Sequence, residues 1–554
     1  MFSFVIFCGL SGHGQDVESV VQADPIKVNG SISASTTYYN AQGIDNRRPP
    51  FYWTINANLN LNLFGVISAP LSLQFSPQGN QFNYPYQQLQ PFNKMGISPK
   101  YKAFTVHLGY RSMNFSKYTY SGNSFYGAGI EVAPKASKWK AQAFFGRLAR
   151  ALNESQNNNA AGITLYDRWA WGTKLGYGTG KHKAELILFK AWDNQNSLIL
   201  FDQADENPAK ENVSVGINTK TTILKNITLN VEYALSAYTT DVNSEQSTAS
   251  GFNYFGGFGG LYQPRVSSQF NSAVNASLNY QHALFNTAVT YRRVDPEYKT
   301  LGIPFLNNDM EDITANVSWR MFQNKINIST NGGFQRNNLS DEQLGRTVRL
   351  IGGVTANYAA SKQVNINAGY SNFNTSTVRT RIELLDSLEY YQVTTTANAG
   401  INYRFGGDSA AHAIMLMGNY QTANDIQENN SELYNGNLNY SYSHVPSGLA
   451  VNGGINANIN SFQGLDNFGW GPMVGISRAF LNKQLRASLN AAYLKYANAG
   501  IAVNQTINTT LNLNYKLRKK HSFGLTAAYI TKEDFQGGQS FSEYRGNLKY
   551  GYSF

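Results

Sequence analysis

The chain has 554 residues, of which 42% are hydrophobic and 14% charged, with 49 Gly, 35 Tyr and 32 Phe. A soluble domain would carry about a quarter charged residues, and a helical membrane protein would show apolar runs of about 20 residues. The sequence has neither feature. Its net charge of +11 is scattered over short basic segments, which excludes the concentrated basic face of a nucleic-acid-binding protein.

Residues 1–15 are expected to be a cleaved export signal, followed by a short periplasmic segment at 16–25. The stretch MFSFVIFCGL is apolar but too short to span a bilayer, and it resembles the hydrophobic part of a signal peptide. Cys8, the one cysteine, would leave with the signal. The mature chain would then suit an oxidising compartment and could hold neither disulfides nor cysteine-ligated metals, and we expect no cofactor.

From residue 26 to residue 554 the dominant pattern is alternation of apolar and polar residues. In residues 51–63, Phe, Trp, Ile, Ala and Leu occupy every second position, and Tyr, Thr and Asn fill the others. Residues 391–405 and 449–459 repeat the pattern. Such long strands match the span that a tilted strand needs to cross lipid with its other face in water, whereas strands of soluble proteins average about 5 or 6 residues. We therefore predict an all-β fold, a single transmembrane antiparallel β-barrel.

The number of strands follows from counting these segments. About 25 alternating segments can be found, and from residue 166 onward their connections alternate between tight turns and long loops, as in outer-membrane barrels. Counting forward from residue 26 and backward from Phe554 gives opposite directions near 102–110. Since single-chain bacterial barrels normally have an even strand number, we predict about 24 strands, with 26 as the alternative.

The conflicting counts place an irregular element between residues 77 and 121. A barrel of 24 strands would be roughly 48 Å across, wide enough to leak if it were empty. About ten residues separate the expected signal from residue 26, so no separate plug domain is predicted there. We therefore expect residues 111–121 to fold into the lumen, with Met113, Phe115, Tyr118 and Tyr120 as lumen-occluding residues. A miscounted strand is the alternative.

Two long loops contain candidate binding residues. The loop around 240–266 holds Tyr254, Phe255, Phe258 and Tyr262, which could bind a sugar or a protein partner, although a flexible surface loop is the default. Asp295, Asp309, Glu311 and Asp312 bracket another loop; their spacing matches no known calcium loop, so solvated acids are favoured over a calcium site. No catalytic motif is present, and we do not predict an enzyme.

The C-terminal sequence LKYGYSF places Tyr550, Tyr552 and Phe554 on one face of a final strand. A last strand that ends in an aromatic residue resembles the signal by which the outer-membrane insertion machinery selects its clients. The whole chain, including the stretches GYRSMNFSKYTYSGNSFYGAGIEV and RVDPEYKTLGIPFLNND, resembles the large outer-membrane β-barrels of Bacteroidota. The resemblance implies an outer-membrane location and a barrel fold, without a substrate.

The sequence thus predicts a bacterial outer-membrane barrel that forms a gated or plugged pore for solutes or polymers. The alternative is a non-conducting scaffold or accessory subunit of an assembly, secretion or surface-attachment complex. The expected partners are outer-membrane lipid, the insertion machinery during assembly and a plug or complex partner protein, with no nucleic acid. Polar Asn, Ser, Thr and Tyr side chains would line the lumen, with few charges to impose ion selectivity.

Overall fold

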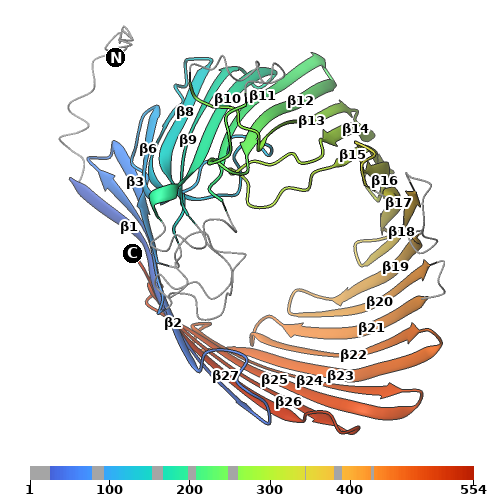
Figure 1. The fold of residues 1–554 in the computed structure, drawn as a ribbon. Coiled ribbons are helices and arrows are strands. Elements are labelled where there is room, and N and C mark those ends of the chain that lie inside the picture. Colours follow the sequence, from blue (N-terminus) through green and yellow to red (C-terminus); the bar gives the residue numbers. More distant parts are fainter. Residues whose placement is uncertain are drawn as a thin grey trace.

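The computed structural model describes residues 25–77, 93–151, 166–197, 208–247, 260–343, 345–379, 390–425 and 430–554. The expected signal, residues 1–15, and nearly all of the expected periplasmic segment lie outside the described residues. The described strands form one antiparallel sheet that closes into a barrel (Figure 1). No helix of the described residues is long and apolar enough to span a membrane.

The strands follow one another around the wall in chain order. They are β1 (Ile26–Gln42), β2 (Phe51–Leu63), β3 (Ile67–Phe75), β4 (Lys94–Ile97), β5 (Lys100–Tyr101), β6 (Phe104–Arg111), β7 (Phe125–Val132), β8 (Trp139–Ala149), β9 (Asp167–Gly178), β10 (His182–Asn194), β11 (Glu211–Leu224), β12 (Ile227–Thr239), β13 (Ser268–Gln281), β14 (Phe285–Val294), β15 (Met310–Met321), β16 (Ile326–Asn337), β17 (Gly345–Ala359), β18 (Val364–Arg379), β19 (Tyr390–Gly406), β20 (Ala410–Asp425), β21 (Ser431–His444), β22 (Leu449–Phe462), β23 (Leu465–Phe480), β24 (Leu485–Asn498), β25 (Ile501–Leu517), β26 (His521–Asp534) and β27 (Phe541–Ser553). A short 3₁₀ turn, η2 (Gln195–Ser197), follows β10.

The barrel has 26 strand positions, because β4 and β5 share one of them. Both short strands pair with β3 on one side and with β6 on the other. They are separated by Ser98 and Pro99, and proline has no N–H to donate to a sheet. The predicted fold class is confirmed with the alternative strand number of 26, and the preferred estimate of 24 was too low. Residues 94–101 are the strand that the sequence count missed.

The first and last strands close the barrel. β1 pairs with β27 along twelve residues, from Ser31 opposite Ser553 to Gln42 opposite Ser542. Gly30 and Phe554 then exchange two backbone hydrogen bonds, with N–O distances of 2.9 and 3.0 Å. A closed barrel leaves no unpaired sheet edge, which is a requirement for backbone that crosses lipid.

Alternation assigns the two faces of the wall. In β23, Phe468, Trp470, Val474 and Ile476 are exposed on the outer face, while Asn467, Gly469, Gly475 and Ser477 hold the inward positions between them. The large exposed hydrophobic side chains of the other wall strands follow the same rule. An apolar outer face and a polar inner face are what a transmembrane barrel requires.

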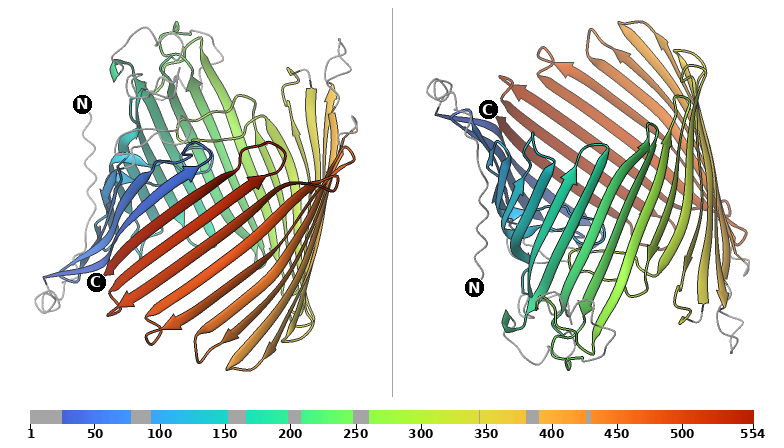
Figure 2. Two further views of the ribbon diagram at one scale, coloured as in Figure 1. Left: turned by 90° about the horizontal axis from the view of Figure 1, so that it is seen from below. Right: turned by 90° about the horizontal axis from the view of Figure 1, so that it is seen from above.

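Connections of different length gather at the two ends of the barrel (Figure 2). Tight turns such as 179–181, 225–226, 481–484 and 518–520 lie at the end that holds Phe554. Longer connections, such as those between β10 and β11, between β12 and β13 and between β14 and β15, leave their strands at the opposite end. The predicted asymmetry between turns and loops is therefore present over the described strands.

Candidate functional site

Two connections from the long-loop end turn back against the inner wall instead of staying at the rim. We call residues 112–124, between β6 and β7, the inner segment, and residues 295–309, between β14 and β15, the inner loop. The inner segment holds the four predicted occluding residues, Met113, Phe115, Tyr118 and Tyr120. Their exposed fractions are 5%, 4%, 2% and 0%, so all four side chains are buried.

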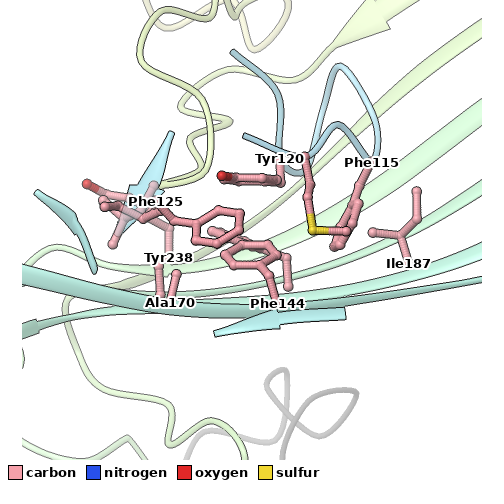
Figure 3. Close-up of a cluster of buried hydrophobic side chains, with 12 residues drawn as sticks. Phe115, Tyr120, Phe125, Phe144, Ala170, Ile187 and Tyr238 are labelled. Carbon is pink, nitrogen blue, oxygen red and sulfur yellow. The ribbon is translucent and has the colours of Figure 1, made fainter. Parts of the chain in front are cut away.

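The aromatic rings of the inner segment pack onto inward-facing side chains of the wall (Figure 3). The Tyr120 ring lies 4.6 Å from the ring of Phe144 on β8 and 5.5 Å from the ring of Phe189 on β10, centroid to centroid. Phe115 lies 5.7 Å from Tyr120. Fully burying one such ring contributes about 1.5 to 3 kcal/mol, so this cluster holds the segment strongly.

Gly172 on β9 makes room for this packing. A Cβ atom at that position would lie 2.6 Å from Cε2 of Phe115 and 2.8 Å from Cε1 of Phe144. Since real Cβ contacts are never this short, any larger residue at Gly172 would push the Phe115 ring away from the wall.

Polar groups of the wall hold the backbone of the inner segment. Lys174 on β9 donates from Nζ to the carbonyl oxygen of Asn114 at 2.9 Å. Glu232 on β12 accepts from Ser116 Oγ at 2.6 Å and from the backbone N–H of Lys117 at 3.0 Å. Burial lowers the pKa of Lys117, and the nearby Glu232 partly offsets that effect. These bonds pair groups whose burial would otherwise be costly.

The inner loop is bonded to the inner segment. The Tyr298 hydroxyl donates to the carbonyl oxygen of Tyr118 at 2.7 Å, and the Thr300 hydroxyl donates to the carbonyl oxygen of Thr119 at 3.0 Å. The N–H of Ser121 donates to the carbonyl oxygen of Gly302 at 3.2 Å. Burial raises the pKa of the Tyr118 and Tyr298 phenols above their ordinary value.

Asn212 on β11 fastens the inner loop to the wall. The side chain is fully buried, and its Oδ1 accepts from the N–H of Leu301 at 3.2 Å and lies 3.0 Å from Thr300 Oγ1. Its Nδ2 donates to Ser236 Oγ at 2.8 Å and to the carbonyl oxygen of Ala237 at 2.9 Å. The inner segment and the inner loop therefore form one bonded layer on the inner face of β8 to β14.

The opposite part of the wall carries no such layer. Among the described residues from Arg346 to Phe554, those that are buried are Thr422 and four glycines, Gly400, Gly469, Gly471 and Gly475. We call the inner faces of β18 to β27 the uncovered arc. Since almost every described side chain there retains contact with solvent, no described segment packs against this arc.

Asparagine and glycine face each other across the strands of the uncovered arc. The directly paired residues are Asn367 with Gly400, Asn398 with Gly369, Asn439 with Gly454, Asn458 with Gly469, and Asn452 and Asn490 with Gly475. A Cβ atom at Gly475 would lie 2.4 Å from Oδ1 of both asparagines. The amides thus lie over bare backbone, and this part of the wall is flat, polar and low in charge.

The other candidate residues that the structure describes lie away from the lumen. Tyr262 is buried with Val213 and Ala237 on the outer face of the rim, where its hydroxyl lies 2.7 Å from Thr239 Oγ1. Tyr254, Phe255 and Phe258 lie outside the described residues. Tyr550, Tyr552 and Phe554 line the outer face at the seam, and the rings of Tyr552 and Phe554 stack at 5.2 Å.

The four acids considered as calcium ligands bind protein donors instead. Asp295 accepts from Ser272 and Arg293, and Asp312 accepts from Arg292. Glu311 accepts from Tyr291 and Arg336 on the outer face, and Asp309 accepts backbone N–H groups of the connection between β16 and β17. Within the described residues, no group of three or more His, Cys, Asp or Glu side chains could hold a metal ion.

Sequence reasoning missed the inner loop and its anchors. Tyr298, Thr300 and Asn212 join the bonded layer to the wall, yet from the sequence only the acids that bracket this loop were considered, and they were expected to be solvated. The sequence signal that could have revealed this loop is the presence of Tyr298 and Leu301 among turn residues in RVDPEYKTLGIPFLNND. Large apolar side chains in a loop indicate that part of the loop is buried, as both of these residues are.

No protein-family model matches the chain, and no curated protein is similar to it. Among solved structures, the FrpB iron transporter from Neisseria meningitidis (F5-1 variant) aligns with 97% of this chain and 84% of its own, at 9% identity and a TM-score of 0.39. The P pilus usher (PapC) translocation pore aligns over 96% of this chain and 99% of its own, at 10% identity and 0.34.

A BenF-like porin from Pseudomonas fluorescens Pf-5 aligns with 63% of this chain and 92% of its own, at 8% identity and a TM-score of 0.32. At these values the likeness transfers no substrate or partner. The location follows instead from the closed wall, the apolar outer face and the polar inner face. The protein is a bacterial outer-membrane β-barrel.

Proposed function

We propose that the protein is an outer-membrane pore for solutes or polymers, narrowed on one side by the inner segment and the inner loop. The observation that carries this proposal is the division of the inner wall. One part is covered by a buried, bonded layer, and the uncovered arc presents asparagine, serine and threonine to the lumen. An inner wall that packed against a protein core would bury apolar side chains. Amide side chains that stay in contact with water are instead typical of the lining of a water-filled channel.

The size of the barrel explains why an internal layer is needed. With 26 strands spaced about 4.8 Å apart and tilted by about 40°, a circular barrel would be roughly 52 Å across. Porins of 16 to 18 strands already conduct water, and 22-stranded transporters need a plug. The inner segment and the inner loop take the place of such a plug along part of the wall.

Deleting the inner segment tests this function. Arg111 and Phe125 pair directly across β6 and β7, so a two-residue Asn-Gly turn can replace residues 112–124 and leave both strands intact. We expect the variant to assemble, to conduct more current per channel in planar bilayers and to sensitise cells to large antibiotics.

The matched control shortens a connection that does not enter the lumen, residues 535–540 between β26 and β27, by the same kind of turn. We expect unchanged conductance for this control. If the variant without the inner segment inserts normally and remains as tight as the parent, then the inner segment does not narrow a pore.

A second candidate function is a non-conducting scaffold whose lumen holds a partner protein. One observation favours it: Phe305, at the tip of the inner loop, is 75% exposed next to the exposed Pro304. An exposed aromatic side chain on a loop that turns into the barrel would offer a contact to a protein held in the lumen. Absence of conductance from both the parent and the deletion variant would favour this function.

The remaining parts of the proposal concern how the protein reaches the membrane. Residues 1–15 would direct export, and Tyr550, Tyr552 and Phe554 would present the last strand to the insertion machinery. A Bacteroidota origin rests on the resemblance of the sequence to large barrels of that group. Replacing Phe554 by Ser should lower the amount of assembled barrel, as judged by heat-modifiable migration on gels.

A further inference from the structure

A polar cavity of about 490 Å³ opens beside the end of the inner loop, where the covered part of the wall ends. Its lining is formed by Leu306, Asn307, Asn308, Asp309, Met310, Gln335, Arg336, Asn337, Gln343, Thr347 and Arg349. Pockets that enclose small ligands measure about 300 to 1,000 Å³, so a solute of the size of a sugar fits this one.

The cavity lies on the lumen side of β15, β16 and β17. In these strands Ile313, Phe334 and Leu350 are exposed on the outer, lipid-facing side. Strand alternation therefore turns Met310, Gln335, Asn337, Thr347 and Arg349 inward. A solute in the lumen can reach all five of these side chains without crossing the wall.

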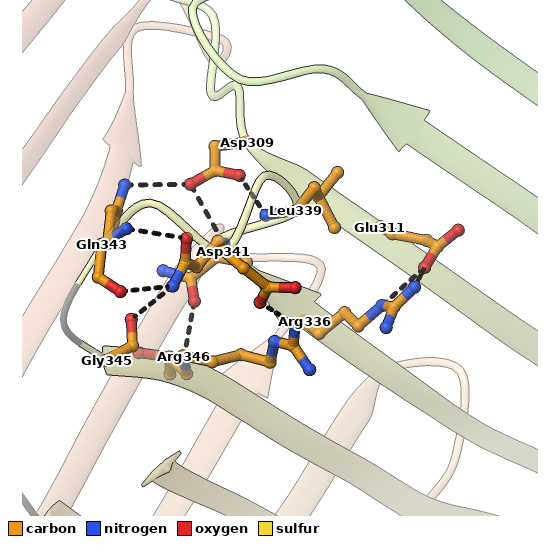
Figure 4. Close-up of polar contacts among 11 residues, drawn as sticks. Asp309, Glu311, Arg336, Leu339, Asp341, Gln343, Gly345 and Arg346 are labelled. Carbon is orange, nitrogen blue, oxygen red and sulfur yellow. Dashed lines mark hydrogen bonds and ion pairs between the residues drawn. The ribbon is translucent and has the colours of Figure 1, made fainter. Parts of the chain in front are cut away.

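The rim of the cavity is held in place by Asp309 (Figure 4). Its carboxylate accepts from the N–H groups of Asn338 and Leu339 at 3.0 and 2.8 Å and from Gln343 Nε2 at 3.1 Å. These bonds join the inner loop to the connection between β16 and β17. They also use both oxygens of Asp309, so this acid is committed to the architecture of the rim.

Besides Asp309, the charged residues that line the cavity are Arg336 and Arg349. Arg336 pairs with Glu311 on the outer face at 2.5 Å. Arg349 donates from Nη1 to Gln335 Oε1 at 3.0 Å and has no carboxylate partner among the described residues. Its guanidinium is exposed to the lumen beside the amides of Asn307, Asn308 and Asn337.

We propose that this cavity binds a hydroxylated solute of the size of a sugar through one carboxylate, which Arg349 engages. A guanidinium presents paired N–H donors that match the two oxygens of a carboxylate. The neighbouring amides can both donate to and accept from hydroxyl groups, and Leu306 and Met310 provide an apolar floor. This inference rests on the proposed function, because it places a selective subsite beside the passage.

The test uses the purified full-length barrel in detergent and isothermal titration with glucuronate and glucose, which differ by the carboxylate. We expect glucuronate to bind at least about tenfold more tightly than glucose. Arg349→Gln should abolish that preference. Arg404→Gln should preserve it, because Arg404 is also an exposed, inward arginine bonded to an amide, that of Asn402, but it lies on β19 outside the cavity.

A second variant fills the cavity instead of changing its charge. Asn307 is exposed on the lining, so Asn307→Trp should fold normally and lose glucuronate binding. Equal affinity for the two sugars, or a preference that survives Arg349→Gln, would overturn the proposal. Measuring the conductance of the same preparation distinguishes failure of the proposed subsite from failure of the proposed pore function. Conduction without glucuronate binding refutes the subsite alone, and Arg349-dependent binding without conduction supports the subsite and refutes the pore.

Discussion

Tyr298 joins the two elements of the internal layer through one side chain. Its ring is buried with Tyr118, Ala234, Ala273 and Val294, and its hydroxyl donates to the carbonyl oxygen of Tyr118. Tyr298→Phe keeps the ring and leaves that buried carbonyl without this donor. We expect a loss of about 0.5 to 1.5 kcal/mol in the free energy of unfolding, measured by urea denaturation in lipid vesicles.

The control for this variant is Tyr544→Phe. Tyr544 is exposed on the outer face, where its ring contacts Tyr529. Its hydroxyl supports no part of the internal layer, so the control should unfold like the parent. Equal losses in the two variants would show that the bond between Tyr298 and Tyr118 does not stabilise the layer.

Leu59 and Asn58 test the assignment of the two faces in β2. Leu59 lies on the apolar outer face near the middle of the strand, and Asn58 is exposed on the inner face. Leu59→Arg should lower the free energy of unfolding by about 2 to 4 kcal/mol, because an arginine at mid-bilayer must leave water. Asn58→Arg should change it little. Similar values for both would mean that the faces are misassigned.

At the scale of elements, Arg111 supports the divided strand formed by β4 and β5. Its Nη1 donates to Ser72 Oγ at 2.9 Å, and its Nη2 donates to the carbonyl oxygens of Pro70 and Gly96. We expect Arg111→Gln to speed hydrogen–deuterium exchange in residues 94–101 and to leave the long strands unchanged. Arg404→Gln is the control, and equal exchange in 94–101 for both variants would contradict this role.

The alternating pattern predicted the long strands well, because each of them must present one face to lipid. Residues 94–101 escaped prediction for a physical reason: Gly96 and Pro99 interrupt the alternation, and Arg111, seventeen residues after Lys94, supplies part of the bonding. The conflicting strand counts had two explanations, a miscounted strand and a segment that leaves the wall, and the fold contains both. A strand was missed, and the neighbouring residues 112–124 do leave the wall.

The inner loop shows where prediction from a single sequence ends. Burial of Met113, Phe115, Tyr118 and Tyr120 in the lumen could be expected because their neighbours fit no strand and the barrel is too wide to stay empty. The position of Tyr298 depends on a contact with Tyr118, 180 residues away. Local periodicity carries no information on such a contact. The same holds for the bonds of Asp309 to Asn338 and Gln343, which form the rim of the Arg349 cavity.

At the scale of the whole molecule, the two ends of the barrel should face different compartments. We expect the tight turns to be periplasmic and the long connections extracellular, because outer-membrane barrels have short periplasmic turns and longer extracellular loops. In a Cys8→Ser background, Gln536→Cys should react with an impermeant maleimide on intact cells, and Lys519→Cys should react only after the outer membrane is opened. The reverse pattern would invert the topology.

The internal layer also makes the barrel mechanically uneven. Along β8 to β14 the wall is two layers thick and cross-linked through Asn212, Glu232 and Tyr298. Along the uncovered arc the wall is a single sheet. Its Asn and Gly residues pair between neighbouring strands, and no second layer lies over them within the described residues. A thin sheet bends more easily than a thick one, so a change in lateral pressure should flatten the uncovered arc first. The strands that hold the Arg349 cavity, β15 to β17, lie between the two-layered part and the uncovered arc. Bending of the arc would therefore begin at these strands.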